Sequence, residues 1–170
     1  MIHLGLATPI EVVELQKEVD TIELRKIPDG AGWAKGSGSQ VEDGWINGLK
    51  NIRLETGDLQ DYPILGQEIL AHLDRIDASL IAVTQMLINV MEPGGQLKWH
   101  RDSGPYRERW HLVIMTNPFC FWNDAINGCR KFRVGWWGPV PYVGVLHSFT
   151  NGGDTERIHL VLDIDRERLA

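Results

Sequence analysis

Cysteine is scarce in this chain of 170 residues, which contains only Cys120 and Cys129. Two cysteines cannot build a disulfide framework, and their spacing matches no zinc motif, so we expect both to be buried thiols, with a disulfide between them as an open but unnecessary alternative. An excess of positive charge is also missing, because the formal net charge is -6 and the isoelectric point is about 5.5. These values argue against nucleic acid as the main ligand.

Long apolar runs are absent as well. No stretch approaches the roughly 18 apolar residues of a membrane span, and the first residues lack the basic start and apolar core of a signal peptide. We therefore expect a soluble, cytoplasmic protein without a membrane partner. With 43% hydrophobic and 24% charged residues, residues 1–170 have the composition of a single globular domain. Nothing in the sequence indicates an oligomeric state.

Two helices are predicted in the first half of the chain. The first covers residues 8–20, where a capping Thr and a Pro precede an apolar face that includes Val13 and Leu15. The second lies within residues 58–78, where apolar side chains recur at helical spacing. Between them, residues 27–58 are rich in Gly and polar residues, which indicates ordered loops or short strands.

From residue 80 onward the pattern changes to short strands. Residues 80–91 are rich in β-branched and apolar side chains, and we expect the following Glu-Pro-Gly-Gly to end that strand. Further strand-like segments are separated by Pro, Gly or Asn clusters; they are QLKWHRD, RWHLVIMTN, CRKFRVGWW, VPYVGVLHSF and RIHLVLDID. The expected fold is mainly β (α+β), with an antiparallel sandwich or jelly roll over about residues 80–165 supported by helices and loops in residues 1–79.

A candidate metal site begins with His100 and Asp102. Because they are two residues apart, their side chains point to the same face of a strand. One imidazole nitrogen and one carboxylate oxygen supply two thirds of the facial triad that holds non-haem Fe(II). His147, 47 residues after His100, can supply the third ligand. Many unrelated chains contain this pattern by chance, so these three residues taken alone favour the alternative of a surface His-Asp hydrogen bond and an unrelated core His.

Two Arg residues add a second signal. Arg109 shares a strand face with His111, and Arg157 lies on the apolar segment near the end of the chain. An Arg is rarely buried alone, so an inward Arg indicates an anion, for which a dicarboxylate held by charge-assisted hydrogen bonds is suitable. The alternative is an internal salt bridge to Asp163 or Glu108. Combined with the candidate iron triad, the anion suggests 2-oxoglutarate.

The motifs together resemble the aspartyl/asparaginyl β-hydroxylase family of Fe(II)- and 2-oxoglutarate-dependent oxygenases. The resemblance covers roughly residues 80–165. It rests on PGGQLKWHRD, on RWH nine positions after His100, on HSFTN, and on Arg157 ten positions after His147. It implies a double-stranded β-helix, which is a cupin-like jelly roll with the metal inside its mouth.

The resemblance also implies roles for individual residues. His100 and His147 would bind Fe(II), and Asp102 would complete the two-His-one-carboxylate form found among bacterial relatives. Arg157 would bind the distal carboxylate of 2-oxoglutarate.

Three more residues match family positions near the co-substrate. Arg109 and His111 would face 2-oxoglutarate, and Asn89 would add a hydrogen bond. The implied activity is a dioxygenase that uses O2 and 2-oxoglutarate to hydroxylate an aliphatic C–H of an amino acid or an aspartyl/asparaginyl-type residue, with release of succinate and CO2. The expected substrate is a small molecule or a peptide, and the sequence does not distinguish between them. Two other classes stay open: a cupin-like metal-dependent hydrolase or isomerase, and a non-enzymatic small-molecule binding module.

Overall fold

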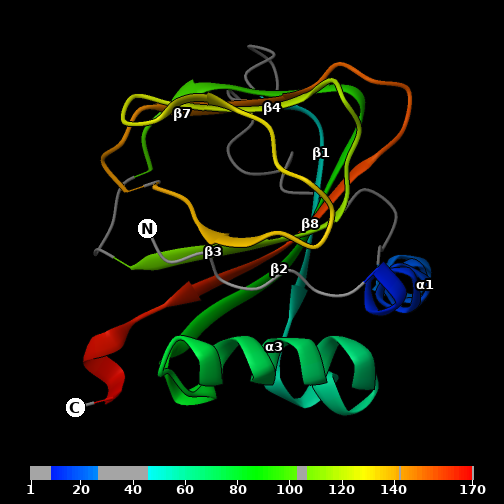
Figure 1. The fold of residues 1–170 in the computed structure, drawn as a ribbon, viewed down its shortest axis with the longest axis vertical. Coiled ribbons are helices and arrows are strands. Elements are labelled where there is room, and N and C mark those ends of the chain that lie inside the picture. The colour runs from blue at the N-terminus through cyan, green and yellow to red at the C-terminus, as the bar shows by residue number, and fades with distance from the viewer. Residues whose placement is uncertain (1–8, 27–45, 103–106, 142, 170) are drawn as a thin grey trace.

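The computed structural model describes residues 9–26, 46–102, 107–141 and 143–169. Two helices, α1 (Pro9–Lys26) and α3 (Pro63–Arg75), lie on one side of a β-structure that folds over into two layers (Figure 1). Three short 3-10 helices cover Thr56–Gln60, Leu80–Ala82 and Arg166–Leu169. None of the helices described in these ranges is long and apolar enough to cross a membrane.

Eight antiparallel strands form the β-structure. They are β1 (Ile46–Leu54), β2 (Val83–His100), β3 (Glu108–Met115), β4 (Cys120–Asp124), β5 (Gly128–Arg130), β6 (Trp137–Pro139), β7 (His147–Asn151) and β8 (Arg157–Ile164). Their order is β5-β4-β7-β2-β8-β3-β6, with β1 also paired to β2. This arrangement confirms the expected antiparallel jelly roll with supporting helices.

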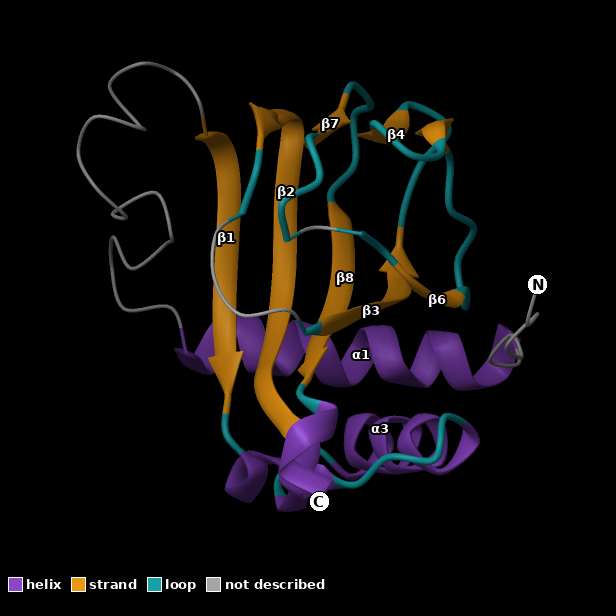
Figure 2. Cartoon of the chain, turned by 90° about the vertical axis from the view of Figure 1, so that its left-hand side faces the viewer, coloured by secondary structure: helices purple, strands orange, loops and turns teal. Residues whose placement is uncertain are grey.

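The long strand β2 belongs to both layers. Its first half pairs with β8 as far as Met91, and its last residues pair with β7 from Gln96 onward. β1 runs beside it along both parts, as Figure 2 shows. Gly94, with φ of 73°, lies in the interval between the two ladders, where the backbone needs a conformation that L side chains rarely adopt. The expectation that Glu-Pro-Gly-Gly ends the strand was therefore wrong.

The main hydrophobic core lies between the helices and the layer that contains β1, β2, β8 and β3. From β8 it takes the alternate residues Ile158, Leu160, Leu162 and Ile164. The α1 helix contributes a face whose members are Val12, Leu15, Val19 and Ile22. The helix is longer than predicted, and Val13 is 49% exposed, so its assignment to the buried face was wrong.

The α3 helix was correctly predicted. Leu65, Ile69 and Leu73 recur every four residues and are buried against the sheet. Beside them lies His72, a fully buried residue whose ring stacks on Trp137 at a centroid distance of 3.8 Å and meets Trp110 edge-on. Neither ring nitrogen of His72 has a hydrogen-bond partner within the described part of the chain.

A smaller core lies between the two β layers. It consists of Leu49, Met91, Trp122, Val140 and Phe149. This cluster fixes the distance between the layers and so supports the side chains that project into the interior between them.

The remaining predictions had mixed outcomes. The strands predicted near β3 and β8 were confirmed, whereas β4 was not predicted, and only short parts of residues 129–137 and 140–149 are strands. Of residues 27–58, the part 27–45 lies outside the described residues, and β1 occupies much of the rest. Cys120 is buried as expected, but Cys129 is exposed, because it faces away from the interior on the hairpin strand β5.

Candidate metal centre and its polar surroundings

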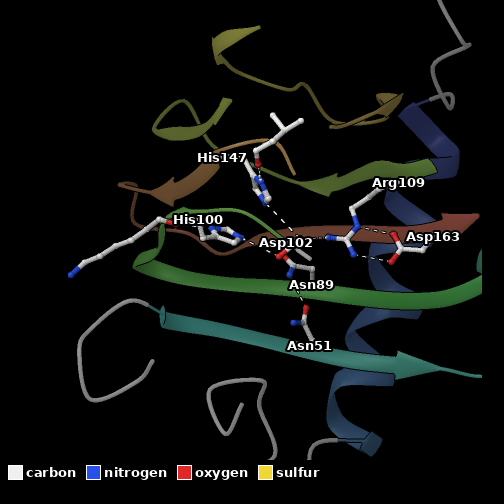
Figure 3. A network of polar contacts seen from close by, with 9 residues as sticks. Asn51, Asn89, His100, Asp102, Arg109, His147 and Asp163 are labelled. Carbon is white, nitrogen blue, oxygen red and sulfur yellow. Dashed lines mark hydrogen bonds and ion pairs between the residues drawn. The ribbon is translucent and has the colours of Figure 1, made fainter. Parts of the chain in front are cut away.

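The structure brings His100, Asp102 and His147 together. His100 ends β2, Asp102 follows it, and His147 begins β7, where His100 and His147 are register partners. The ligand atoms of all three residues lie within 4.8 Å of one another. Nε2 of His100 is 3.6 Å from Asp102 Oδ1, and Nε2 of His147 is 3.8 Å from Oδ2 (Figure 3). Two imidazole nitrogens and a carboxylate oxygen facing one point are a suitable donor set for a divalent transition metal.

The backbone orients both imidazoles. Nδ1 of His100 lies 2.8 Å from the carbonyl oxygen of Lys98, and Nδ1 of His147 lies 2.8 Å from that of Val145. A carbonyl oxygen accepts only, so Nδ1 is the donor in both rings and Nε2 is the atom left to bind a metal. Burial is the main reason why the pKa of His147 is lowered, which favours the neutral form that binds metal.

Arg109 links the carboxylate of Asp102 to that of Asp163. Nη1 of Arg109 is 3.4 Å from Asp102 Oδ2, while Nε and Nη2 of the same guanidinium donate to both oxygens of Asp163 at 2.7 and 2.8 Å. Asp163 is almost fully buried, so its bidentate bond with Arg109 is well screened from water. Arg109 therefore makes the internal salt bridge to Asp163 considered above. Its contact with the co-substrate stays a prediction.

Replacing Asp163 by Asn is expected to weaken metal binding about tenfold, the lower end of the effect of losing a group bonded to a metal ligand, because Asp163 acts on Asp102 through Arg109. Without the second carboxylate oxygen, Arg109 loses its bidentate anchor and competes with the metal for Asp102. Titration of Mn²⁺ against a competing chelator measures the effect. The matched control is Glu108→Gln, which breaks the ion pair with Arg166. Equal affinity in Asp163→Asn and wild type would contradict this role.

Arg157 lies in the interior and is 3% exposed. Nη1 donates to Asn89 Oδ1 at 2.8 Å, Nη2 donates to His159 Nδ1 at 2.9 Å, and the guanidinium lies over the Phe149 ring at 4.6 Å. All of these partners are neutral, and no carboxylate pairs with Arg157 among the described residues. Burial lowers the pKa of Arg157 to about 10, which leaves it charged at neutral pH.

A layer of polar side chains continues from Arg157 across the interior. Asn89 donates from Nδ2 to Asn51 Oδ1 at 2.7 Å, which keeps its own Oδ1 available to Arg157. On the other side, Nδ1 of His159 lies 3.1 Å from Nδ1 of His111. The predicted co-substrate residues Asn89, His111 and Arg157 thus come from β2, β3 and β8 and form one contiguous group.

Aromatic rings connect this group with the metal site. Phe149 stacks on Trp122 at a centroid distance of 5.9 Å, and Trp122 stacks on His147 at 5.1 Å. The indole N–H of Trp122 donates to the buried carboxylate of Asp124 at 2.9 Å. Arg157 and the metal triad therefore face one interior, with these rings forming a shared wall.

Sequence reasoning left some of these residues without a role. Asp124 was missed because β4 was missed. It accepts bonds from Trp122 and from Arg130 Nη2, so it fixes both side chains on the interior side of the β4–β5 hairpin. His159 is a buried, hydrogen-bonded residue of the interior. The alternation of His159 with Arg157 on β8 was the available signal that both face inward.

The comparison with protein families gives a clear result. A family model described as aspartyl/asparaginyl beta-hydroxylase matches residues 65–167, which is more than half of the chain and includes α3 and the candidate metal centre. The chain belongs to the aspartyl/asparaginyl β-hydroxylase family. The membership predicted from its motifs is therefore confirmed, and with it the oxygenase class of enzyme.

Other comparisons are less informative. A search of curated proteins found no match. Among solved structures, a cupin-like protein from Thermotoga maritima is 18% identical, with 74% of this chain and 75% of that one covered and a TM-score of 0.45. A predicted oxalate decarboxylase from the same organism is 14% identical, with 68% and 79% covered and a TM-score of 0.44. These scores are too low to carry an argument about activity.

Proposed function

We propose that this protein is an Fe(II)- and 2-oxoglutarate-dependent dioxygenase that hydroxylates an aliphatic C–H of an amino acid or of an aspartyl/asparaginyl-type residue. The reaction consumes O2 and releases succinate and CO2. His100, Asp102 and His147 would hold the iron, since two imidazoles and a carboxylate on one face leave positions open for other ligands. When bound, the iron supplies the oxygen activation that protein side chains cannot perform.

The observation that carries the proposal is the environment of Arg157. Removing the Arg157 guanidinium from water costs free energy, and none of its described partners has a negative charge to offset that cost. An anion that enters the same interior can offset it. The distal carboxylate of 2-oxoglutarate is such an anion, and a planar guanidinium can bind it through two parallel N–H donors. Its 2-oxo acid end would then extend toward the triad.

The other residues would position the reactants and exclude water. Asn89 and His159 hold the guanidinium of Arg157 in one orientation, so little side-chain freedom is lost when the carboxylate binds. Arg109 holds Asp102 through the salt bridge with Asp163. Trp122, Phe149 and Met91 line the interior with apolar surface, which strengthens charge interactions there.

The two alternative classes make less use of these features. A hydrolase or isomerase needs a metal-bound water and a substrate, but it does not need a buried Arg without a carboxylate partner in the same interior. A binding module needs neither the oriented Nε2 atoms nor the salt bridge that supports Asp102. The Arg157 environment is therefore the feature that separates the dioxygenase from both.

The first test needs no knowledge of the substrate. Purified full-length protein is titrated without oxygen with Fe(II) and then with 2-oxoglutarate, while the visible charge-transfer absorption of a chelated 2-oxo acid is recorded. We expect the band in the wild type and its loss in His147→Ala. Glutarate, which has both carboxylates but no 2-oxo group, is the matched ligand control and is expected to give no band.

The outcomes distinguish the candidate functions. A band that appears as expected justifies screening amino acids and peptides for succinate release in the presence of oxygen. Tight metal binding without any band would reject the co-substrate and favour the hydrolase or isomerase. If no metal binds, the result favours the non-enzymatic binding module.

A further inference from the structure

The contact between Arg157 and His159 fixes the position of one proton. Nη2 of Arg157 lies 2.9 Å from His159 Nδ1. A guanidinium can only donate, so Nδ1 of His159 is the acceptor. A neutral His159 must then carry its proton on Nε2.

The contact between the two imidazoles fixes a second proton. Nδ1 of His111 lies 3.1 Å from the same Nδ1 of His159. Two facing lone pairs would repel, and His159 Nδ1 has no proton to donate, so Nδ1 of His111 must be the donor. In a neutral His111 the other nitrogen, Nε2, is therefore a bare acceptor. No group among the described residues forms a hydrogen bond with it.

The surroundings keep both rings neutral. Burial is the largest influence that lowers the pKa of His111, followed by the positive charge of Arg157 and then Arg109. Burial and Arg157 lower the pKa of His159 in the same way. The remaining titratable groups that act on His111 are His147 on β7 and Arg130 on β5.

Of the three guanidiniums, Arg109 and Arg130 are each paired with a carboxylate, from Asp163 and Asp124 respectively. Arg157 has no such partner in the described chain, so it is the cation whose effect on His111 an incoming anion would change most.

His111 is predicted to face 2-oxoglutarate, and the structure places it in the same polar group as Arg157. The ring of His111 contacts His159 on one side and meets Trp122 edge-on at 5.6 Å on the other. Trp122 in turn stacks on His147, so it contacts both His111 and that candidate ligand. A carboxylate near the bare Nε2 of His111 would face a lone pair, which is repulsive unless Nε2 gains a proton.

We propose, building on the dioxygenase function above, that His159 is a positioning residue that fixes His111 as a hydrogen-bond acceptor, so that 2-oxoglutarate binds together with one proton. The proton passes from solvent to His111 Nε2 and converts it into a charged donor for the ligand. No electrons move in this step. Departure of the dicarboxylate product, succinate, returns the proton to solvent.

Calorimetry can measure this proton directly. Binding of 2-oxoglutarate to the full-length Mn²⁺-loaded protein is measured near pH 7.5 in several buffers with different ionisation enthalpies. We expect uptake of about one proton in the wild type, with an affinity that falls about tenfold per pH unit on the alkaline side. His159→Leu releases His111 to carry its proton on Nε2, so we expect uptake near zero and an affinity that varies little with pH.

Two further variants complete the design. His111→Gln supplies an amide donor that needs no proton, and we again expect uptake near zero. His72→Leu is the matched control, because it removes a buried His outside this network and should leave the uptake unchanged. If His159→Leu does not fold, His111→Gln still tests the proposal.

The results separate this inference from the function on which it rests. Measurable binding of 2-oxoglutarate to the wild type without proton uptake would overturn the inference and leave the dioxygenase proposal intact. Unchanged uptake in a folded His159→Leu or His111→Gln would overturn it as well. If no charge-transfer band forms in the wild type, the proposed function itself is rejected.

Discussion

Replacement of Arg157 by Met is expected to weaken 2-oxoglutarate binding by about 100- to 10,000-fold. Each charge-assisted hydrogen bond to the distal carboxylate contributes about 1.5 to 3 kcal/mol, and the guanidinium can provide two. Met fills a similar elongated volume beside Phe149 but offers no donor. The loss is measured as the dissociation constant of 2-oxoglutarate from the Mn²⁺-loaded protein.

Folding is expected to survive this change. The depressed pKa of Arg157, about 10 against 12.5, corresponds to an unfavourable burial of about 3 kcal/mol that Met would relieve. Against this, Met leaves Asn89 Oδ1 without its donor, at a cost of about 1 to 3 kcal/mol. The two effects oppose each other, so we expect the free energy of unfolding to change by less than about 2 kcal/mol.

Two controls make the result specific. Arg166→Met removes a partly exposed Arg that follows β8 and pairs with Glu108, and it should leave ligand affinity unchanged. 2-Oxobutanoate lacks the distal carboxylate, so it should bind equally weakly to wild type and Arg157→Met. Equal affinity of the two proteins for 2-oxoglutarate would show that Arg157 does not receive the carboxylate.

Acid is expected to destabilise the fold through His72. Burial is the main cause that lowers its pKa from 6.5 to about 3, with a smaller contribution from Arg75. The unfolded chain therefore binds a proton at His72 that the folded protein excludes, and stability falls as the pH decreases from about 6.5 toward 3. Between pH 7 and pH 4 this single group removes about 3 kcal/mol from the free energy of unfolding.

The variant His72→Leu tests this expectation. Leu has a similar volume and cannot titrate, so urea unfolding at pH 7 and pH 4 should show a smaller loss of stability than in the wild type, by about 3 kcal/mol. His72→Gln also lacks the charge and should give the same flattened pH profile even if it is less stable at both pH values. Parallel profiles for all three proteins would exclude His72 as the acid-sensitive group.

The local features of the site were predictable from sequence. His100 and Asp102 are two residues apart on one strand, and Arg157 follows His147 at a spacing typical of the family, so short-range pattern was sufficient to choose them. Their tertiary partners were harder to choose. Arg109 had two candidate carboxylates, Asp163 and Glu108, and only the register of β3 with β8 selects the first.

Other features depend on long-range pairing that leaves no local pattern. The contact of His111 with His159 requires the particular alignment of β3 and β8, in which the two residues are diagonal neighbours. Pro93 suggested a strand end because it lacks an amide proton. The ladder to β8 stops at Met91 and that to β7 resumes at Gln96, so Pro93 lies where neither ladder requires a donor.

The position of the triad also matters for the chain between its members. Asp102 and His147 are separated by 45 residues (147 − 102 = 45), and this segment contains β3 to β6, which reach into both layers. An ion held by both residues would close a loop of that length and restrict the unfolded ensemble, much as a crosslink does. Because such an ion would bind the native arrangement and not the unfolded chain, the free energy of unfolding would rise with its free concentration, and removal of the metal would lower it.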